Sequence, residues 1–228
     1  MKKLAIFDID GTIFRSSLLI EVVRELIAEE IFPKSAERVY AESHENWLNR
    51  TGGYEEYIMD VVRVFEKHIK GVSYEDFLRI SRKVALVHKR RVYTYTRDLV
   101  KKLKKKGYFL LAISQSPKSM LDDFCRAWGF DKVYGRMYEI NNKSLFTGKT
   151  LFMEHIANKE NILRRFVEKE TLSLEGSVGV GDTEGDITFL TFVENPICFN
   201  PNKKLYEHAK KHRWKIIVER KDVIYTIQ

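Results

Sequence analysis

The sequence is poor in the residues that mark several classes of protein. It holds two cysteines and four prolines among 228 residues. Cys125 and Cys198 are too few for a disulfide scaffold and lack the spacing of metal ligands, which excludes both kinds of small stapled domain. The apolar runs extend over only a few residues and cannot cross a bilayer, so we expect no membrane partner.

Features of exported and of disordered chains are also scarce. Met1-Lys2-Lys3 has the positive charge that begins a signal peptide, but Asp8 and Asp10 interrupt the apolar stretch that follows. The sequence shows no internal repeat and no low-complexity segment. We therefore expect a cytoplasmic protein with reduced thiols, and its hydrophobic fraction of 44% is that of a globular chain.

Positive charge is in excess, with a formal net charge of +8. Much of the excess lies in the run Lys101–Lys106, where Leu99, Val100 and Leu103 have the spacing of the buried side of a short helix. A basic surface can attract polynucleotides. However, no aromatic residue interleaves with these lysines, as a stacking surface for single strands requires. We interpret the run as a solvated helix face and expect no nucleic-acid partner.

Short apolar runs alternate with helical stretches from Phe109 onward, which predicts βαβ units and a mostly parallel sheet. The runs expected to form strands are 4–7, 109–113, 132–140, 177–180, 197–199 and 215–218. The stretches expected to form helices are 117–128, 158–169 and 202–212. The segment 141–150 is rich in turn residues.

The region between the first strand and Phe109 is helical in pattern throughout. The stretches with apolar residues at helical spacing are 19–31, 54–70 and 74–87. An insertion of roughly 75 residues is too long for a connection and should form a domain of its own. We therefore predict an α/β fold with a core domain of residues 1–14 and 92–228 and a helical cap domain of residues 15–91.

Two carboxylates follow the first strand in the segment Asp8-Ile9-Asp10-Gly11-Thr12. Asp8 stands where the strand ends, and a carboxylate there can attack a phosphoryl group as a nucleophile. Asp10 points from the same side of an extended segment and can protonate a leaving alkoxide and later deprotonate water. Gly11 permits a tight passage of the chain, and Thr12 offers a hydroxyl and a backbone N–H to an anion. The alternative interpretation is a turn with incidental acids, because Asp and Gly favour turns.

A second acidic cluster follows a later apolar run, in Gly181-Asp182-Thr183-Glu184-Gly185-Asp186. Because the carboxyl ends of parallel strands meet at one edge of a sheet, we expect Asp182 to lie near Asp8. Oxygen ligands of this kind suit a hard divalent cation such as Mg²⁺. Asp186 can bind the ion through water or hold a lysine, whereas Glu184 is interpreted as a helix-start or surface acid.

Two further positions are candidates for holding a phosphate. Ser114 ends the second core strand, and its hydroxyl, with N–H groups near the next helix start, can receive a phosphate. Ser116 is interpreted as the cap of that helix, with Pro117 at its first position. Lys159 begins a later helix and would neutralise phosphate charge and keep Asp8 ionised. The alternative for Lys159 is a solvated surface lysine.

In this order and spacing the motifs resemble those of the haloacid dehalogenase-like hydrolase superfamily, and within it the phosphoserine-phosphatase-like branch, subfamily IB. The matching segments are Asp8-Ile9-Asp10-Gly11-Thr12, Ser114, Lys159, and Gly181-Asp182 with Asp186. The resemblance implies a Rossmann-like three-layer core with a helical cap of the C1 type inserted after the first motif. It also implies a phosphoric monoester hydrolase that works through an aspartyl-phosphate on Asp8.

The resemblance further implies a division of labour among these residues. Asp8 and Asp10 are expected to be catalytic, and Mg²⁺ to be held by Asp8, Asp182 and the backbone carbonyl of Asp10. The residues expected around the phosphate are Thr12, Ser114, Gln115 and Lys159. Asp186 is expected to support the metal ligands.

The sequence departs from phosphoserine phosphatases at three places. Their amine-binding glutamate after the first motif corresponds to about Ser17 here, and their Gly-Gly-Phe after the second motif is Gln115-Ser116-Pro117. Their Asn-Asp in the fourth motif is Gly185-Asp186. These changes keep the phosphoryl chemistry, so we predict a Mg²⁺-dependent phosphatase of small phosphomonoesters for which phosphoserine is not the best substrate.

Three alternatives stay open. The protein can be a phosphoserine phosphatase proper, or a phosphatase of nucleotides or nucleic-acid ends, which the charge of +8 would favour. From another class, it can be an inactive binding protein on the same fold. Proteins of that class usually lack a nucleophile or a metal ligand, and here none is missing. The residues that select the leaving alcohol follow no readable code.

Overall fold

The computed structural model describes residues 1–151, 159–170 and 172–227. The chain divides into two compact units. The core unit comprises Met1–Ser16, Lys89–Arg136 and Phe152–Gln228, and the helical unit comprises Ser17–His88 and Met137–Leu151. The first strand and both acidic motifs belong to the core unit.

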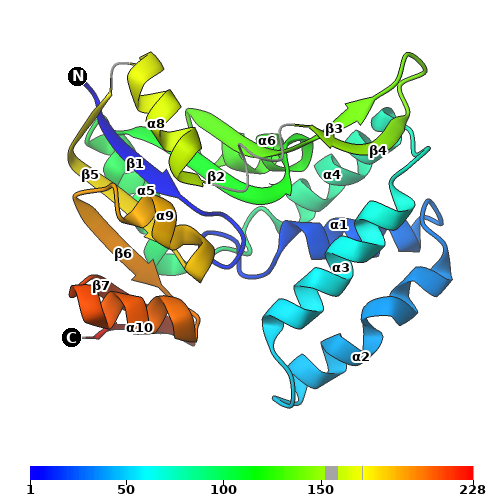
Figure 1. Cartoon of the computed structure of the whole chain (residues 1–228), viewed down its shortest axis with the longest axis horizontal. Helices are drawn as coiled ribbons and strands as arrows, with labels where there is room; N and C mark the ends of the chain where they lie inside the picture. Colours follow the sequence, from blue (N-terminus) through cyan, green and yellow to red (C-terminus); the bar gives the residue numbers. More distant parts are fainter. Residues whose placement is uncertain (152–158, 171, 228) are drawn as a thin grey trace. The chain divides into compact units, whose positions relative to one another are not determined.

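The core unit is built on a sheet whose strands are mostly parallel (Figure 1). Its strands are β1 (Lys3–Phe7), β2 (Phe109–Pro117), β3 (Lys132–Ile140), β5 (Ser173–Gly181), β6 (Asn195–Phe199), β7 (Lys215–Arg220) and β8 (Val223–Ile227). They lie in the order β3-β2-β1-β5-β6-β7-β8. The strand β8 runs antiparallel to β7, and the other neighbours in this series are parallel. The predicted α/β fold with a mostly parallel sheet is therefore confirmed.

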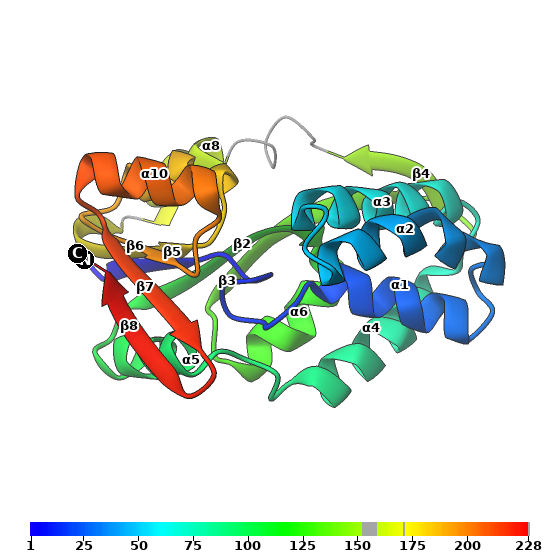
Figure 2. The same ribbon diagram turned by 90° about the horizontal axis from the view of Figure 1, so that it is seen from below.

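Helices cover both faces of the central strands (Figure 2). The helices on one face are α5 (Thr94–Lys105) and α6 (Lys118–Ala127), and those on the other are α8 (Lys159–Glu170), α9 (Ile187–Leu190) and α10 (Lys203–His212). Leu4, Ala5, Ile6 and Phe7 are consequently all fully buried. Burial on both faces explains why β1 is a continuous apolar run and does not alternate.

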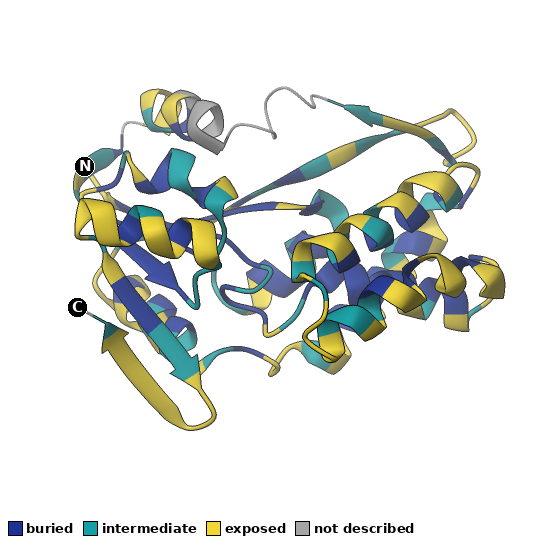
Figure 3. Ribbon diagram, turned by 60° about the horizontal axis from the view of Figure 1, so that its bottom comes forward, coloured by how far each residue is buried: buried dark blue, intermediate teal, exposed yellow. Residues whose placement is uncertain are grey.

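The helical unit contains the α-helices that lie between β1 and α5 in the chain. They are α1 (Leu18–Ala28), α2 (Glu37–Leu48), α3 (Tyr54–His68) and α4 (Tyr74–His88), with a short 3-10 helix η1 (Lys34–Ala36). The helices α1, α3 and α4 match the stretches predicted as helical to within a few residues. The helices α3 and α4 each have a buried and an exposed side (Figure 3), whereas most residues of α1 are buried. The helix α2 was not expected, because among its residues only Tyr40 and Ser43 are buried. It packs on α3 through aromatic rings, with Trp47 stacked on Tyr57 at 5.8 Å.

A β-hairpin also belongs to the helical unit. The strand β4 (Phe146–Leu151) pairs antiparallel with the second half of β3. The ring of Phe146 lies 5.3 Å from that of Phe77, and the Phe146 N–H donates to the Val72 carbonyl at 3.0 Å. The sequence predicts that residues 137–151 belong to the core domain and that 141–150 are rich in turns, whereas in the structure Met137–Leu151 belongs to the helical unit and includes the strand β4. A strand there depends on these distant contacts and not on its local pattern.

Two surface elements complete the comparison with the sequence. In α5, Val100 and Leu103 are buried while the neighbouring lysines are exposed, which confirms the interpretation of a solvated helix face. The edge strand β8 was not expected, and four of its five residues are exposed (Figure 3). Within the described ranges, no helix combines the length and the apolar character that a membrane span needs.

Candidate active site

Two strand ends bring the two acidic motifs together. The strands β1 and β5 are parallel neighbours, with Phe7 aligned to Val180. Asp8 follows β1 directly, and its N–H donates to the Val180 carbonyl at 2.9 Å. Asp182 follows β5 directly. The register of the sheet therefore places the two aspartates side by side at its carboxyl edge.

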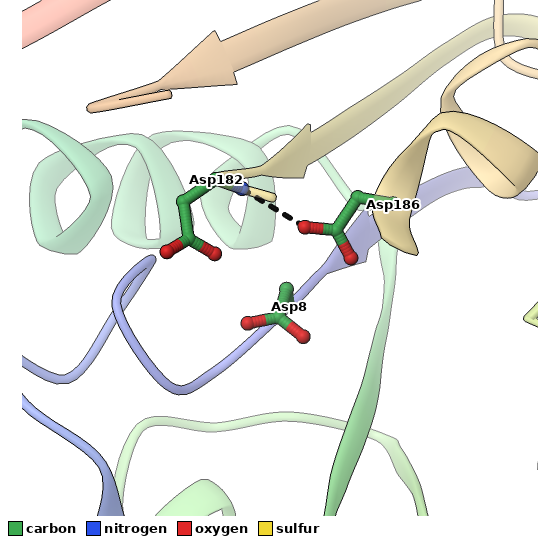
Figure 4. A group of neighbouring side chains, drawn as sticks. All are labelled: Asp8, Asp182 and Asp186. Atoms are coloured by element: carbon green, nitrogen blue, oxygen red, sulfur yellow. Dashed lines mark hydrogen bonds between the residues drawn. The ribbon is translucent and has the colours of Figure 1, made fainter. Parts of the chain in front are cut away.

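Three carboxylates meet at this edge. Asp8, Asp182 and Asp186 each offer one oxygen, and these oxygens all lie within 4.8 Å of one another (Figure 4). Asp8 and Asp186 are buried, whereas Asp182 is partly exposed. Unscreened negative charges this close repel one another, so the cluster favours a cation between them.

Asp186 fixes the backbone that carries Asp182. Its Oδ2 accepts the N–H groups of Asp182 at 2.9 Å and of Thr183 at 3.1 Å (Figure 4). Thr183 and Asp186 form a capping box at the 3-10 helix η2 (Glu184–Asp186), and Asp186 is fully buried. Gly181 has no room for a side chain, because a Cβ there would lie 2.5 Å from the Asp186 Cβ. The supporting role of Asp186 stays a prediction, and its two hydrogen bonds to the backbone of Asp182 and Thr183 are consistent with that role.

The loop after Asp8 packs closely on Asp182. Gly11 has φ +83°, and a Cβ there would lie 2.1 Å from Asp182 Oδ2, so glycine alone fits. The Thr12 hydroxyl donates to Asp182 Oδ1 at 3.1 Å, and Thr12 is fully buried. The Thr96 hydroxyl in turn donates to the Thr12 carbonyl at 2.8 Å. With its hydroxyl bonded to Asp182, Thr12 has its backbone N–H left to serve a phosphate.

Asp10 lies apart from the three-carboxylate cluster and is held by two serines. Its Oδ2 accepts hydrogen bonds from Ser114 Oγ at 2.8 Å and from Ser116 Oγ at 2.7 Å. Both serines are buried, with exposed fractions of 1% and 5%. Two hydroxyl donors on one oxygen fix the orientation of this carboxyl group beside the nucleophile candidate Asp8.

The prediction that Ser116 caps the following helix is wrong. The strand β2 continues to Pro117, α6 begins at Lys118, and its start has no side-chain cap. Because side chains alternate along a strand, Ser116 points to the same side as Ser114 and reaches Asp10. Gln115 points the other way, is exposed, and its Oε1 accepts from Arg136 Nη2 at 3.1 Å. The phosphate-binding role of Gln115 stays a prediction.

Lys159 is the first residue of α8. Its side chain falls outside what the structure describes, as does the segment 152–158 before it. Its predicted contact with phosphate therefore stays a prediction. The core unit brings together the remaining predicted residues, which are Asp8, Asp10, Thr12, Ser114, Asp182 and Asp186.

Burial sets the chemistry of two neighbouring groups. Burial, and then the nearby Asp182 carboxylate, raise the pKa of Tyr93, so its hydroxyl stays protonated. Burial, followed by the charge of Asp10, raises the pKa of the Cys125 thiol well above its ordinary value. A thiol kept protonated is a poor nucleophile. The Cys125 thiol is therefore not a candidate nucleophile of this site.

Sequence reasoning missed two residues of this site. Ser116 could have been found from the period of two that continues from Ser114 along a strand. Thr96 carries no signal, because it lies 84 residues from Thr12 in the chain. Only the packing of α5 against the loop after β1 brings it there.

The donor set fits a hard divalent cation. All three groups of the cluster are carboxylate oxygens, which are the ligands that Mg²⁺ prefers, and no softer donor belongs to it among the described residues. Asp8 and Asp182 would hold the ion, because Asp186 Oδ2 is already bonded to two N–H groups.

Comparisons with known proteins agree with this geometry. The family model of the haloacid dehalogenase-like hydrolases matches residues 5–191. The chain therefore belongs to this family, which confirms the resemblance seen in the sequence.

The curated relatives share about a quarter of their residues with this chain. A phosphoserine phosphatase of Archaeoglobus fulgidus is 26% identical over 209 residues, which cover 91% of this chain and 55% of that protein. The chain thus spans about half the length of that relative. A phosphoserine phosphatase of Methanocaldococcus jannaschii is 25% identical, with 97% and 94% covered. Among solved structures, a phospho-aspartyl intermediate analogue of phosphoserine phosphatase has a TM-score of 0.62 at 21% identity, covering 97% of this chain and 95% of that one. This last likeness is one of fold.

Proposed function

We propose that the protein is a Mg²⁺-dependent phosphatase that hydrolyses small phosphomonoesters through an aspartyl-phosphate on Asp8. The observation that carries the proposal is the arrangement of Asp8 beside Asp182, with Asp10 held by two hydroxyls two residues further on. The relatives described as phosphoserine phosphatases and the structural likeness to a phospho-aspartyl analogue support the same reaction class.

The first step transfers the phosphoryl group to Asp8. A carboxylate oxygen of Asp8 attacks phosphorus, and the ester P–O bond breaks with its electron pair left on the alcohol oxygen. Asp10, protonated at this stage, gives its proton to that oxygen, and the alcohol leaves. The products of the step are an acyl phosphate on Asp8 and an ionised Asp10.

The second step regenerates the enzyme. Asp10, now a carboxylate, takes a proton from water, and the water oxygen attacks phosphorus. The P–O bond to Asp8 breaks, its electrons restore the Asp8 carboxylate, and inorganic phosphate is released. The same carboxyl group thus returns to its protonated form, as a full cycle requires.

The remaining groups bind and orient the phosphate. Mg²⁺ bound to Asp8 and Asp182 would neutralise phosphate charge during transfer. Ser114 Oγ, which lies 2.8 Å from Asp10 Oδ2, and the Thr12 N–H are proposed as donors to the phosphate. Lys159 is proposed as the remaining cation at the phosphate.

Substrate choice is proposed to differ from that of phosphoserine phosphatases. Ser17, at the place of their amine-binding glutamate, is buried and caps α1, where its Oγ accepts the Leu19 N–H at 3.2 Å. A capping hydroxyl supplies no negative charge for an ammonium group, and an ammonium left without a counter-charge is costly to bury. We therefore expect a sugar, glycerol or related phosphate to exceed phosphoserine in kcat/KM.

The experiment combines one variant with a panel of phosphomonoesters. Wild-type protein with Mg²⁺ should release phosphate, EDTA should abolish the release, and Asp8→Asn should remove it while the circular dichroism spectrum stays unchanged. The matched control is Asp98→Asn, which changes an exposed aspartate of α5 that pairs with Arg97. It should keep wild-type activity. Near wild-type single-turnover release by Asp8→Asn would overturn the covalent mechanism.

The panel should hold phosphoserine, sugar and glycerol phosphates, and nucleotide monophosphates. Phosphoserine ahead of the others by more than about tenfold in kcat/KM would show that our interpretation of Ser17 is wrong. A nucleotide ahead by the same margin would favour the alternative of a nucleotide phosphatase.

A further inference from the structure

Ser116 occupies a position that the proposed reaction has not yet used. Its Oγ donates to Asp10 Oδ2 at 2.7 Å, and its backbone N–H donates to Ser114 Oγ at 3.0 Å. Ser114 Oγ donates to the same Asp10 oxygen at 2.8 Å. Ser116 is thus bonded to both the proposed acid–base and the proposed phosphate ligand, and it is 95% buried since its exposed fraction is 5%.

The backbone around Ser116 is built for this position. Gly135, on the neighbouring strand β3, lies so close that a Cβ there would be 2.7 Å from the Ser116 carbonyl oxygen. The strand β2 extends to Pro117, and its parallel pairing with β3 shifts register between Ile113 and Pro117, where Ser114 and Ser116 lie. Both hydroxyls nevertheless point to the same side, because both donate to Asp10 Oδ2.

Binding of a phosphate would change the hydrogen-bond partner of Ser114 but not that of Ser116. Ser114 is the proposed phosphate donor and has one proton, so it cannot donate to the phosphate and to Asp10 at once. Ser116 is then the hydroxyl that remains for Asp10.

We infer that Ser116 is a positioning residue that holds the Asp10 carboxyl group in place for proton transfer to the leaving alcohol. This inference rests on the proposed function. In phosphoserine phosphatases the corresponding position is a glycine, as judged from the Gly-Gly-Phe pattern, so the device belongs to this chain's own sequence.

The test compares two leaving groups in Ser116→Ala. An alkyl ester such as glycerol phosphate needs its leaving oxygen protonated, whereas p-nitrophenyl phosphate leaves as a stable phenolate and needs little help. We expect kcat/KM for glycerol phosphate to fall by about 10–100-fold, and for p-nitrophenyl phosphate by less than about threefold. Inhibition by inorganic phosphate should stay within about threefold of wild type, because the phosphate donors remain.

Two further variants make the test decisive. Ser116→Thr keeps the hydroxyl and should recover most of the activity toward glycerol phosphate. Ser35→Ala removes the hydroxyl of an exposed serine in η1, outside the site, and should leave both substrates unaffected. An equal loss on both esters in Ser116→Ala, or no loss on either, overturns the inference. If the wild type hydrolyses neither ester, it is the proposed function that fails.

A second, independent observation concerns a hollow in the core unit at the other edge of the sheet. It has a volume of about 620 Å³ and is lined by the first residues of β6 and by the segment that enters β7. Asp8 and Asp182 follow the carboxyl ends of their strands, whereas this hollow lies at amino ends. The hollow is therefore separate from the candidate active site.

The lining of the hollow combines apolar walls with positive charge. Its apolar lining includes the half-buried ring of Trp214 together with Val178 and Ile197, which are 8% and 7% exposed, and Leu190, which is fully buried. Its cations are Lys102, Lys106, Arg213 and Lys215. In the described part of the chain no carboxylate forms an ion pair with any of the four. The one acid of the lining, Glu194, accepts the Gly176 N–H.

The geometry points to a second binding site here, for a small organic anion with an apolar ring. A volume of this size is typical of small-molecule pockets. Four cations that have no carboxylate partner among the described residues attract an anion, and the half-buried indole ring of Trp214 offers a face to a flat apolar body.

The probe is 8-anilinonaphthalene-1-sulfonate, with the uncharged N-phenyl-1-naphthylamine as its matched analogue. The sulfonate should bind at one site with a Kd at least about tenfold lower than that of the uncharged probe. The double variant Lys102→Glu with Lys215→Glu should raise the Kd at least about tenfold. Lys105→Glu, an exposed lysine of α5 outside the lining, should change it by less than about twofold.

The alternatives are outcomes of the same titration. Equal binding to the double variant and to Lys105→Glu would show a general attraction to the lysine run and overturn the proposal. Competition by inorganic phosphate with Mg²⁺ would place the probe in the candidate active site and overturn it as well. Unchanged affinity in the presence of phosphate and Mg²⁺ is the expected result.

Discussion

At Gly11 the absence of a side chain lets two motifs from opposite ends of the chain touch. The residue has φ +83°, and the carboxylate of Asp182 fills the space where a Cβ would be. The neighbouring Thr12 then bonds to the same carboxylate at 3.1 Å. Asp182, the proposed metal ligand, is thus oriented by contact with the loop that follows Asp8, the proposed nucleophile.

Gly11→Ala is expected to weaken Mg²⁺ binding. The new methyl group must displace Asp182, so the Mg²⁺ concentration needed for half-maximal activity should rise by about 10–100-fold, as for outer-shell changes at metal sites. The rise in melting temperature on adding Mg²⁺ should shrink in parallel. The control is Gly107→Ala, which has a similar φ of +78° and no atom within 4 Å of the new Cβ. An equal effect of both variants would mean that backbone strain alone is responsible.

The two cysteines should be inert in the folded protein. Burial raises the pKa of Cys125 well above its ordinary value, and burial, helped by the Asp186 charge, raises that of Cys198 to about 12. Reaction requires the thiolate, so iodoacetamide at about pH 8 should label neither thiol in the native state and both in guanidinium chloride. Mass spectrometry after a timed quench measures the labelling, and rapid native labelling of Cys125 would contradict its burial behind the site.

At the scale of elements, Ser17 at the start of α1 has a structural role as the N-cap of the helix. The Ser17 hydroxyl accepts the Leu19 N–H, which satisfies one of the free N–H groups at the helix start. An N-cap needs a short acceptor side chain, which serine supplies. The position thereby gains a structural role where related enzymes use a glutamate for the substrate.

Ser17→Ala should destabilise the protein by about 1 kcal/mol through loss of this cap. The free energy of unfolding from urea denaturation measures it, with the slope against urea unchanged. The control is Ser35→Ala, an exposed serine within η1, which should change stability by less than about 0.5 kcal/mol. If Ser17→Ala lowers the free energy of unfolding by no more than the control does, the Ser17 cap does not stabilise the protein.

At the scale of the whole molecule, buried tyrosines link stability to alkaline pH. Burial raises the pKa of Tyr40 to about 12, and burial also raises the pKa values of Tyr57, Tyr93, Tyr95 and Tyr134. The folded state therefore holds these protons more tightly than the unfolded chain does. The resulting stabilisation is fully present below the unfolded pKa of about 10 and is lost as pH rises from there toward 12.

We expect the melting temperature to fall steadily between about pH 10 and 12, with absorbance at 295 nm rising over the same interval. Tyr40→Phe removes the tyrosine whose pKa is raised to about 12, so the melting temperature of this variant should fall less steeply over the same pH interval. Tyr225→Phe, a change of an exposed residue in β8, should follow the wild-type curve. A wild-type melting temperature that stays constant to pH 12 would contradict the linkage.

The sequence by itself determined the class of the fold and the chemistry of its site. The apolar runs of β1 and β5 and the helical periods between them follow from local residue patterns, because burial on both faces requires continuous apolar strands. The acids Asp8 and Asp182 stand directly after two such runs. Parallel strands bring their carboxyl ends to one edge, so the meeting of the two acids could be predicted before any coordinates.

Tertiary structure alone decided which distant partners the polar groups of Thr12, Thr96 and Ser116 take. Thr12 and Asp182 are 170 residues apart, and Thr96 is 84 residues from Thr12, so no local pattern reports their bonds. Ser116 was taken for a helix cap because its neighbours allow that local hydrogen bond. The strand β2 instead continues to Pro117, and the Ser116 hydroxyl donates to Asp10. Local propensity offers a polar side chain several partners, and packing over long sequence distances selects one.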